Sequence, residues 1–198
     1  MSNTGPPPES RNTHSFETER LLVELPNETD AEVLFGLVGG PHRREICATL
    51  IWDGPEEISE TREWIEKANT LSFEDFGYHW VIRDREGSLS GASRQALGAI
   101  GTRPRDNPGR ADVGYWLGHP YWGKGVMGEA LRALIELGFN ELDYYKMEAD
   151  VHTHNERGIR LVESAGMSRE GVIRKAYRKY GELVDTALYG LLREEWAG

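Results

Sequence analysis

Cysteine, long apolar runs and basic charge are all scarce in this sequence. The single cysteine, Cys47, excludes an internal disulfide, and its neighbours Ile46 and Ala48 indicate a small buried residue rather than a nucleophile. No stretch reaches the roughly 18 uncharged apolar residues that a membrane span requires, so we expect no membrane partner. The formal net charge of −10 argues against nucleic-acid binding, because phosphate backbones attract a basic face. An acidic protein suits a cationic partner such as an amine.

The amino-terminal residues also lack most of what a folded or secreted segment needs. Residues 1–15 hold the run Pro6-Pro7-Pro8 among polar residues, with almost nothing apolar to bury, so we predict a flexible tail. They show no basic and apolar signal pattern, and we therefore expect a cytoplasmic protein. Residues 16–198 suffice for one core and a single domain, since 38% of the 198-residue chain is hydrophobic.

The hydrophobic period changes along the chain. Ser59 and Asn155 are predicted helix caps, and Gly166 is a predicted left-handed residue at a helix end. Helical spacing covers residues 33–38, 61–71, 126–139 and 156–165. Extended apolar segments are expected at residues 20–25, 78–82, 97–102, 111–117, 146–151, 172–173 and 184–192. Early helices, an antiparallel meander and then alternating strands and helices predict one mixed α/β domain.

The clearest chemistry lies in the strand-to-helix turn Trp122-Gly123-Lys124-Gly125-Val126-Met127-Gly128. Its glycines let several unpaired backbone N–H groups converge on one point, with the positive end of the helix dipole behind them. A side chain there would keep phosphate oxygens away from the amides. The turn therefore predicts a pyrophosphate site. Lys124 could add charge, although a turn lysine of this kind is more often solvated.

The same turn also spells G-x-G-x-x-G, the fingerprint of dinucleotide-binding folds, and Asp143 lies 20 positions after the first glycine. That fold needs the strand to run directly into the first glycine, but residues 119–122 intervene. It also needs a long alternating array after the turn, and only about seventy residues remain. The spacing argues against a nicotinamide cofactor.

Together with residues elsewhere, the turn resembles the GCN5-related N-acetyltransferase (GNAT) superfamily and its Rim-type branch, which acetylates the N-termini of ribosomal proteins. The resemblance spans nearly everything after the tail. Its motifs are Thr18-Glu19-Arg20-Leu21-Leu22, Val113-Gly114-Tyr115-Trp116-Leu117, residues 121–130, Asn155-Glu156-Arg157-Gly158, Ala165-Gly166-Met167, Glu170-Gly171 and residues 192–196. It implies a mostly antiparallel twisted sheet of about seven strands, splayed in the middle and flanked by about four helices.

The resemblance implies acetyl-CoA as the cosubstrate, with its pantetheine arm between the central strand and the strand at residues 146–151. Backbone groups near Trp116 to Gly118 would pair with the arm, and one N–H there could polarise the thioester carbonyl. Asn155 would bind the pantetheine, act as a plain helix cap, or do both. The implied binding residues are Trp116, Leu117, Gly118, Trp122, Gly123, Lys124, Gly125, Val126, Met127, Gly128 and Asn155.

Some positions depart from the family's pattern. Trp122 and Met127 replace the residues usual in the loop, which leaves the backbone donors in place. Gly158 stands where Rim-type enzymes often carry a serine proposed to protonate the departing thiolate. A CoA thiol should have a pKa not far from the roughly 8.5 of cysteine, so its thiolate leaves with little help and the reaction is not forbidden.

The catalytic candidates follow from these departures. Tyr177 is the best local replacement as acid, and a partly buried aromatic is its alternative role. The attacking amine must be neutral, so a base or a water chain is expected. Asp112 lies on the central strand, where the superfamily often puts its carboxylate base, and His154 and His152 follow the neighbouring strand. No metal is implied, because these histidines lack further ligands at a convincing spacing.

The sequence thus predicts an N-acetyltransferase that moves an acetyl group from acetyl-CoA to a primary amine by direct attack in a ternary complex. Only the resemblance to the Rim-type branch favours a protein or peptide N-terminus as the acceptor. A small-molecule amine as the acceptor and a longer acyl-CoA as the donor are open alternatives. A non-catalytic acyl-CoA sensor is the rival from another class. Trp52, Trp64 and Trp80 could shape the acceptor pocket or pack in the core, and a homodimer is a further expectation.

Overall fold

A single mixed sheet organises the computed structural model, which describes residues 15–71 and 75–197. Its eight strands within these residues lie side by side in the order β1-β2-β3-β4-β5-β6-β8-β7. All neighbours are antiparallel except β5 and β6. The strands are β1 Ser15–Glu17, β2 Leu21–Glu24, β3 Tyr78–Asp84, β4 Ala96–Pro104, β5 Arg110–Leu117, β6 Lys146–His152, β7 Ser168–Lys179 and β8 Glu182–Leu192.

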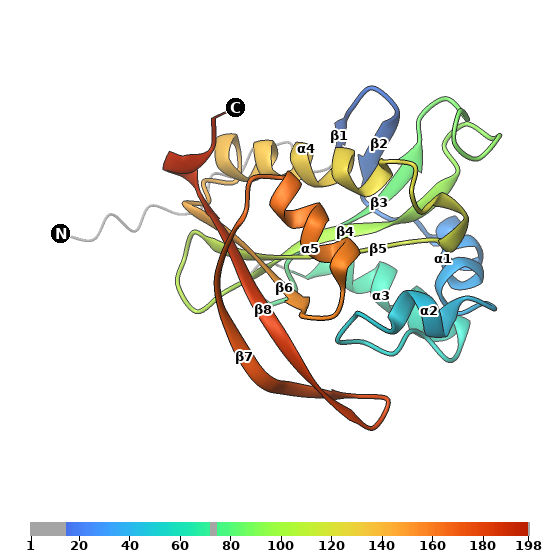
Figure 1. The fold of residues 1–198 in the computed structure, drawn as a ribbon. Helices are drawn as coiled ribbons and strands as arrows, with labels where there is room; N and C mark the ends of the chain where they lie inside the picture. Colours follow the sequence, from blue (N-terminus) through green and yellow to red (C-terminus); the bar gives the residue numbers. More distant parts are fainter. Residues whose placement is uncertain (1–14, 72–74, 198) are drawn as a thin grey trace.

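Helices cover both faces of this sheet (Figure 1). On one face lie α4 and α5, and on the other lie α1, α2 and α3. No helix among residues 15–71 and 75–197 is long and apolar enough to cross a membrane. The α-helices are α1 Ala31–Val38, α2 Arg43–Cys47, α3 Ile58–Thr70, α4 Val126–Asn140 and α5 Glu156–Ser164, and short 3-10 turns occupy η1 Glu28–Asp30, η2 His119–Tyr121 and η3 Arg193–Glu195.

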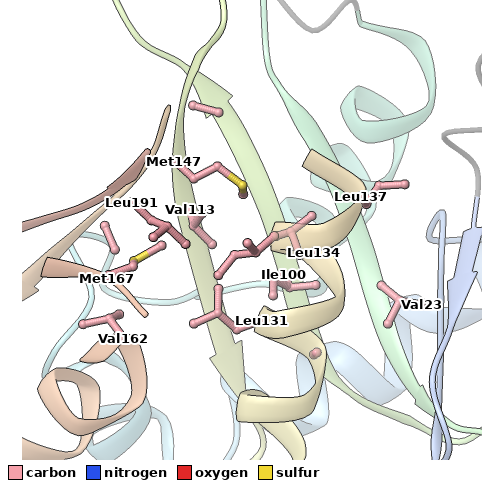
Figure 2. Packing of buried hydrophobic residues seen from close by; sticks show 14 of the residues in the cluster. Val23, Ile100, Val113, Leu131, Leu134, Leu137, Met147, Val162, Met167 and Leu191 are labelled. Atoms are coloured by element: carbon pink, nitrogen blue, oxygen red, sulfur yellow. The ribbon is translucent and has the colours of Figure 1, made fainter. Parts of the chain in front are cut away.

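The main core lies between α4 and the sheet. Leu131 and Leu134 point from α4 onto Ile100, Val113 and Met147 of the central strands (Figure 2). These side chains are at most 5% exposed, so each contributes on the order of 2 kcal/mol of hydrophobic burial. The apolar side of α4 therefore packs against the apolar face of the central strands. This packing fixes the position of α4 relative to β5.

The predicted architecture is confirmed, with small differences in the elements. The additional ones are β1 and α2, which are too short to leave a periodic signal. The cap of α3 is Glu57 rather than Ser59, because Glu57 and Glu60 form a reciprocal capping box. Gly166 has a φ of 92° after α5, as predicted. Residues 1–14 of the predicted tail lie outside the described residues, and Ser15 already belongs to β1.

The central strands separate in the middle of the sheet, as the resemblance implies. Strands β5 and β6 pair in parallel only where Arg110, Ala111 and Asp112 face Lys146, Met147 and Glu148. Beyond these pairs β5 continues to Leu117 and β6 to His152 without further pairing to each other. The backbone edges that face this split have lost a neighbouring strand, so they can accept an extended ligand.

Candidate active site

The turn between β5 and α4 presents main-chain donors rather than side chains. Gly123 and Gly125 have φ values of 73° and 76°, in the left-handed region that favours glycine. Gly125 is the N-cap of α4, and no side chain caps the helix there. The N–H groups of a first helical turn have no intrahelical acceptor, and they carry the positive end of the dipole. A Cβ at Gly123 would meet nothing within 4 Å, so the space is open to an anion.

Cationic side chains surround this helix end at some distance. Arg20 is bound to Glu129 at 2.6 Å and donates to the Lys124 carbonyl at 3.1 Å, which ties β2 to the turn. The Arg157 guanidinium lies 5.1 Å from the centre of the Trp122 ring. Lys124 itself donates to the Leu89 carbonyl at 3.3 Å and does not line the cavity described next. Of these three cations, Arg157 is therefore the one that lines the cavity.

One continuous cavity of about 890 Å³ begins at this turn and passes through the split between β5 and β6 to the opposite face of the sheet. This volume exceeds what a water-filled packing defect occupies and matches a site for a sizeable ligand. At its donor end, which we define by the residues of the β5–α4 turn and of α5, the cavity is lined by Trp122, Gly123, Gly125, Val126, Met127, Gly128, Asn155, Arg157, Gly158 and Leu161.

Hydrogen bonds on β5 narrow the choice of backbone groups for an inserted ligand. The Gly118 N–H already donates to the Leu97 carbonyl at 2.8 Å, and the Leu117 carbonyl accepts from Trp122 Nε1 at 2.8 Å. Alternate residues of an antiparallel ladder direct their backbone groups to opposite sides. The backbone groups of Trp116, two residues before Gly118, therefore point toward β4. The backbone groups of Tyr115 and the N–H of Leu117 point toward the split. Of the predicted partners Trp116, Leu117 and Gly118, only Leu117 therefore has a backbone group that faces the split, and Tyr115 is an additional candidate.

Asn155 combines a capping contact with a place in the cavity lining. Its Oδ1 accepts from the Gly158 N–H at 3.0 Å, which confirms its role as the N-cap of α5. A Cβ at Gly158 would lie 2.5 Å from Asn155 Nδ2 and 3.0 Å from Val151 Cγ1. A side chain at position 158 would therefore displace the Asn155 cap, so a serine could not be introduced here without a local shift.

A bulge in β7 aims Tyr177 into the cavity. Between the pairs formed by Ile173 and by Tyr177 the strand register shifts, and Lys175 adopts a φ of 53°. The Lys175 N–H donates to Asp185 Oδ1 at 2.8 Å, which stabilises the bulge. The Tyr177 hydroxyl is buried and makes no hydrogen bond of good geometry within the described residues, and burial raises its pKa. Tyr177 therefore lines the cavity, and its buried hydroxyl stays neutral.

Asp112 lies at the base of the split, where two arginines hold its carboxylate. Arg103 donates to one oxygen at 2.7 Å and Arg105 to the other at 3.0 Å, while Arg105 also reaches Asp150 at 2.9 Å. Burial raises the pKa of Asp112 although Arg105 and Arg103 act in the opposite direction. With both oxygens already engaged by cations, Asp112 is better placed to orient Arg103 than to accept a proton from an amine.

The two histidines at the end of β6 and just beyond it lie away from the cavity. His154 is exposed and is not a lining residue, and its ring centre is 5.4 Å from that of His152. His152 is only 1% exposed, and burial lowers its pKa, with smaller contributions from His154 and Lys179. Its ring lies 5.3 Å from Tyr177, so His152 supports the tyrosine rather than facing the cavity.

The acceptor end of the cavity is formed by side chains. We define it by the lining residues from α1, α3, β3 and the loops beside them, together with Arg103, Asp112, Asp150 and Tyr177 on the adjoining strands. Of the tryptophans considered above, Trp52 and Trp64 line it, whereas Trp80 is fully buried in the core. His79 on β3 also lines it and was missed by the sequence analysis. Only its position opposite glycines on the neighbouring strands could have indicated it. Charged lining residues are Glu60, Glu63, Lys67, Asp75, Arg103, Asp112 and Asp150.

His42, Glu45 and His119 form the group that could hold a metal ion among residues 15–71 and 75–197. The two imidazole rings stack at 4.0 Å with 6° between their planes. Parallel rings do not direct their lone pairs at one point, as a bound ion would require. Glu45 instead accepts from His42 at 2.7 Å, and this contact lowers the pKa of Glu45. The group ties α2 to η2, just before the glycine turn.

Comparison with known proteins gives a consistent result. A family model described as an acetyltransferase (GNAT) domain matches residues 20–168. The "Uncharacterized N-acetyltransferase p20" of Bacillus licheniformis is 32% identical over 182 residues, which are 91% of this chain and 97% of the relative. The "Putative ribosomal N-acetyltransferase YdaF" of Bacillus subtilis is 33% identical over 181 residues, 91% of this chain and 95% of the relative.

A similar fold occurs among solved structures. The ribosomal L7/L12 alpha-N-protein acetyltransferase RimL, solved with coenzyme A, superposes with a TM-score of 0.77 at 18% identity, covering 88% of this chain and 95% of that one. This likeness concerns the fold, which includes the arrangement of strands around the split.

Proposed function

Because the chain belongs to the GNAT acetyltransferase family and is an acetyl-CoA-dependent N-acetyltransferase, we propose that its acceptor is the N-terminal amine of a peptide or protein. One observation carries the proposal: a single cavity joins a backbone anion site to an acceptor region of different chemistry through the split in the sheet. A donor and an acceptor that enter from opposite ends can meet there without leaving the protein.

The donor end fits the cosubstrate by the chemistry of its groups. The left-handed glycines leave room for phosphate oxygens at the start of α4, and Arg157 offers a charge beside them. The edge of β5 at Tyr115 and Leu117 offers backbone groups to the amides of the pantetheine arm. Acetyl-CoA supplies an activated acyl group, which these residues would hold in the split.

The acceptor end fits a cation of moderate size. Carboxylates outnumber cations among its charged lining residues, so an ammonium group is attracted rather than repelled. The names of YdaF and RimL refer to ribosomal acetylation, which supports a peptide N-terminus as the acceptor. We further propose that Tyr177 donates a proton to the departing sulfur, since this residue lines the cavity and burial keeps its hydroxyl neutral.

A thiol-release assay tests this function. Purified protein is mixed with acetyl-CoA and peptides that carry a free N-terminus, and each peptide is compared with its N-terminally acetylated form as the matched control. We expect the CoA thiol to be released only when the peptide has a free N-terminus. The peptide should gain the mass of one acetyl group, which fragmentation in a mass spectrometer should locate at that N-terminus.

Other results of the same assay decide among the alternatives. Release with small amines but with no peptide would replace the proposed acceptor by a small molecule. Release that is faster with longer acyl-CoA donors would change the acyl group. If calorimetry shows that acetyl-CoA binds but no amine causes the release of the CoA thiol, the catalytic proposal is overturned in favour of a sensor. The cytoplasmic location and the homodimer stay predictions.

A further inference from the structure

His79 occupies the acceptor end of the cavity with its tautomer fixed by the backbone. Its Nε2 lies 3.0 Å from the Phe76 carbonyl oxygen. A carbonyl oxygen only accepts hydrogen bonds, so Nε2 must carry the hydrogen. In the neutral ring Nδ1 then holds a lone pair and can accept a proton. The rings of Phe76 and Trp64 lie 4.5 and 6.0 Å from the imidazole and hold its plane.

A row of glycines opens the sheet surface between His79 and the split. His79 pairs with Gly101 on β4, and Gly101 pairs with Gly114 on β5. Directly paired residues of antiparallel strands share one face of the sheet. A Cβ at Gly101 would lie 2.8 Å from His79 Nδ1, so this nitrogen sits above the glycine. A Cβ at Gly114 would meet nothing within 4 Å, so the path from Nδ1 to the split is open.

The surroundings keep the imidazole neutral near pH 7. Burial lowers the pKa of His79, the bond to the Phe76 carbonyl opposes this, and the charge of Arg103 lowers it further. Charged groups that line the cavity on the packed elements are Glu63 and Lys67 on α3, Asp75 before β3, Arg103 on β4 and Asp112 on β5. Because the Asp112 carboxylate is engaged by two arginines, His79 is the better proton acceptor on this face.

We propose that His79 is the catalytic base of the acetyl transfer, a role that rests on the proposed function. The lone pair of the amine nitrogen forms a bond to the thioester carbonyl carbon, and the surplus proton of that nitrogen passes to His79 Nδ1. The bond from carbon to sulfur breaks, its electron pair stays on sulfur, and the sulfur takes up a proton. His79 returns its proton to solvent, so one amide and one thiol result from one amine and one thioester.

A measurement without substrate tests the preparation of this base. Long-range proton–nitrogen NMR spectra of the labelled full chain report the tautomer of each histidine, and loss of one signal set in His79→Gln assigns it. We expect an Nε2–H tautomer that is neutral at pH 7 and titrates below the ordinary value of about 6.5. An Nδ1–H tautomer, or a charged ring at pH 7, would overturn the proposal.

A kinetic measurement tests its use. The acceptors are water and the peptide that the wild type acetylates fastest. With both we expect His79→Gln to lower kcat on the order of 100-fold or more, with the affinity for acetyl-CoA unchanged. With water as the acceptor, which unlike a peptide amine does not titrate in this range, the wild-type rate should fall as the pH drops through the pKa of His79, because a protonated ring accepts no proton, and the variant should lack this fall. His42→Gln is the matched control, since His42 does not line the cavity.

Failure of this inference differs from failure of the proposed function. If His79→Gln keeps the wild-type rate and pH profile while both proteins bind acetyl-CoA, the base lies elsewhere and the acetyltransferase assignment is untouched. Wild-type protein that binds acetyl-CoA but releases no thiol to peptide or water would overturn both the acceptor proposal and the role of His79.

Discussion

The two ends of the cavity are built from different parts of the chain. The donor end uses consecutive residues of one turn, and its working groups are backbone N–H groups exposed by Gly123 and Gly125. The acceptor end collects side chains such as Trp52, His79 and Tyr177 from segments that are far apart in the sequence. The donor end can therefore change many side chains and keep its donors, as Trp122 shows, whereas the acceptor end changes with every side chain.

Breaking the donor end should produce the largest effect. In Gly125→Asp we expect acetyl-CoA affinity to fall on the order of 100-fold, about 3 kcal/mol, because a left-handed φ strains the new residue and its carboxylate occupies the anion site. A carboxylate there would also meet Arg20, whose Nη2 lies 3.4 Å from a Cβ at this position. Calorimetry measures the change.

Gly181→Asp provides the matched control for that substitution. Gly181 has a φ of 88° in the turn between β7 and β8, and a Cβ there meets nothing within 4 Å. It should pay a similar conformational strain and bind acetyl-CoA as the wild type does. Equal affinities of the two variants would show that the turn is not the cosubstrate site.

A smaller effect is expected where the acceptor end is held in place. Arg83 on β3 binds Asp30, before α1, through two contacts of 2.7 and 2.8 Å, and both residues are buried. Asp30→Ala leaves this guanidinium with Glu24 and a long contact to the Arg94 carbonyl, so we expect the free energy of unfolding to fall by about 2 kcal/mol. Urea unfolding measures this change, and Glu32→Ala, which removes an exposed carboxylate in the first turn of α1, should change stability little.

The Asp30 substitution also separates the two ends. If the donor end is independent of α1, the folded variant should bind acetyl-CoA as the wild type does but transfer the acetyl group to peptides more slowly. A parallel loss of acetyl-CoA affinity would mean that the two ends form one cooperative unit, contrary to the comparison drawn above.

The smallest effect concerns the hydroxyl missing at position 158. Gly158→Ser should lower stability by about 1 kcal/mol and bring no gain in rate, because its Cβ presses on Asn155 and Val151. Gly171→Ser, on the edge strand β7 where a Cβ meets nothing within 4 Å, is the control. Thermal unfolding and thiol release measure both. If Gly158→Ser is faster than the wild type, the serine supplies an acid that the wild type lacks, and Tyr177 does not fill that role.

Much of the donor end could be predicted from the sequence because its geometry is local. The glycines of the turn, the start of α4 at Val126 and the cap at Asn155 depend on residues within one turn of each other. The acceptor end could not be predicted in this way. Asp112 was a candidate base until Arg103 and Arg105 were found on its carboxylate, and His154 lies outside the cavity.

The sequence by itself determined the order of strands and helices, the glycine turn at the start of α4 and the family to which the chain belongs. Only the tertiary structure decided which side chains share the cavity. Strand register places His79 over Gly101, and a bulge turns Tyr177 inward, neither of which leaves a periodic signal. The reason is physical: backbone conformation follows from neighbouring residues, whereas cross-strand contacts follow from pairings between residues far apart in the chain.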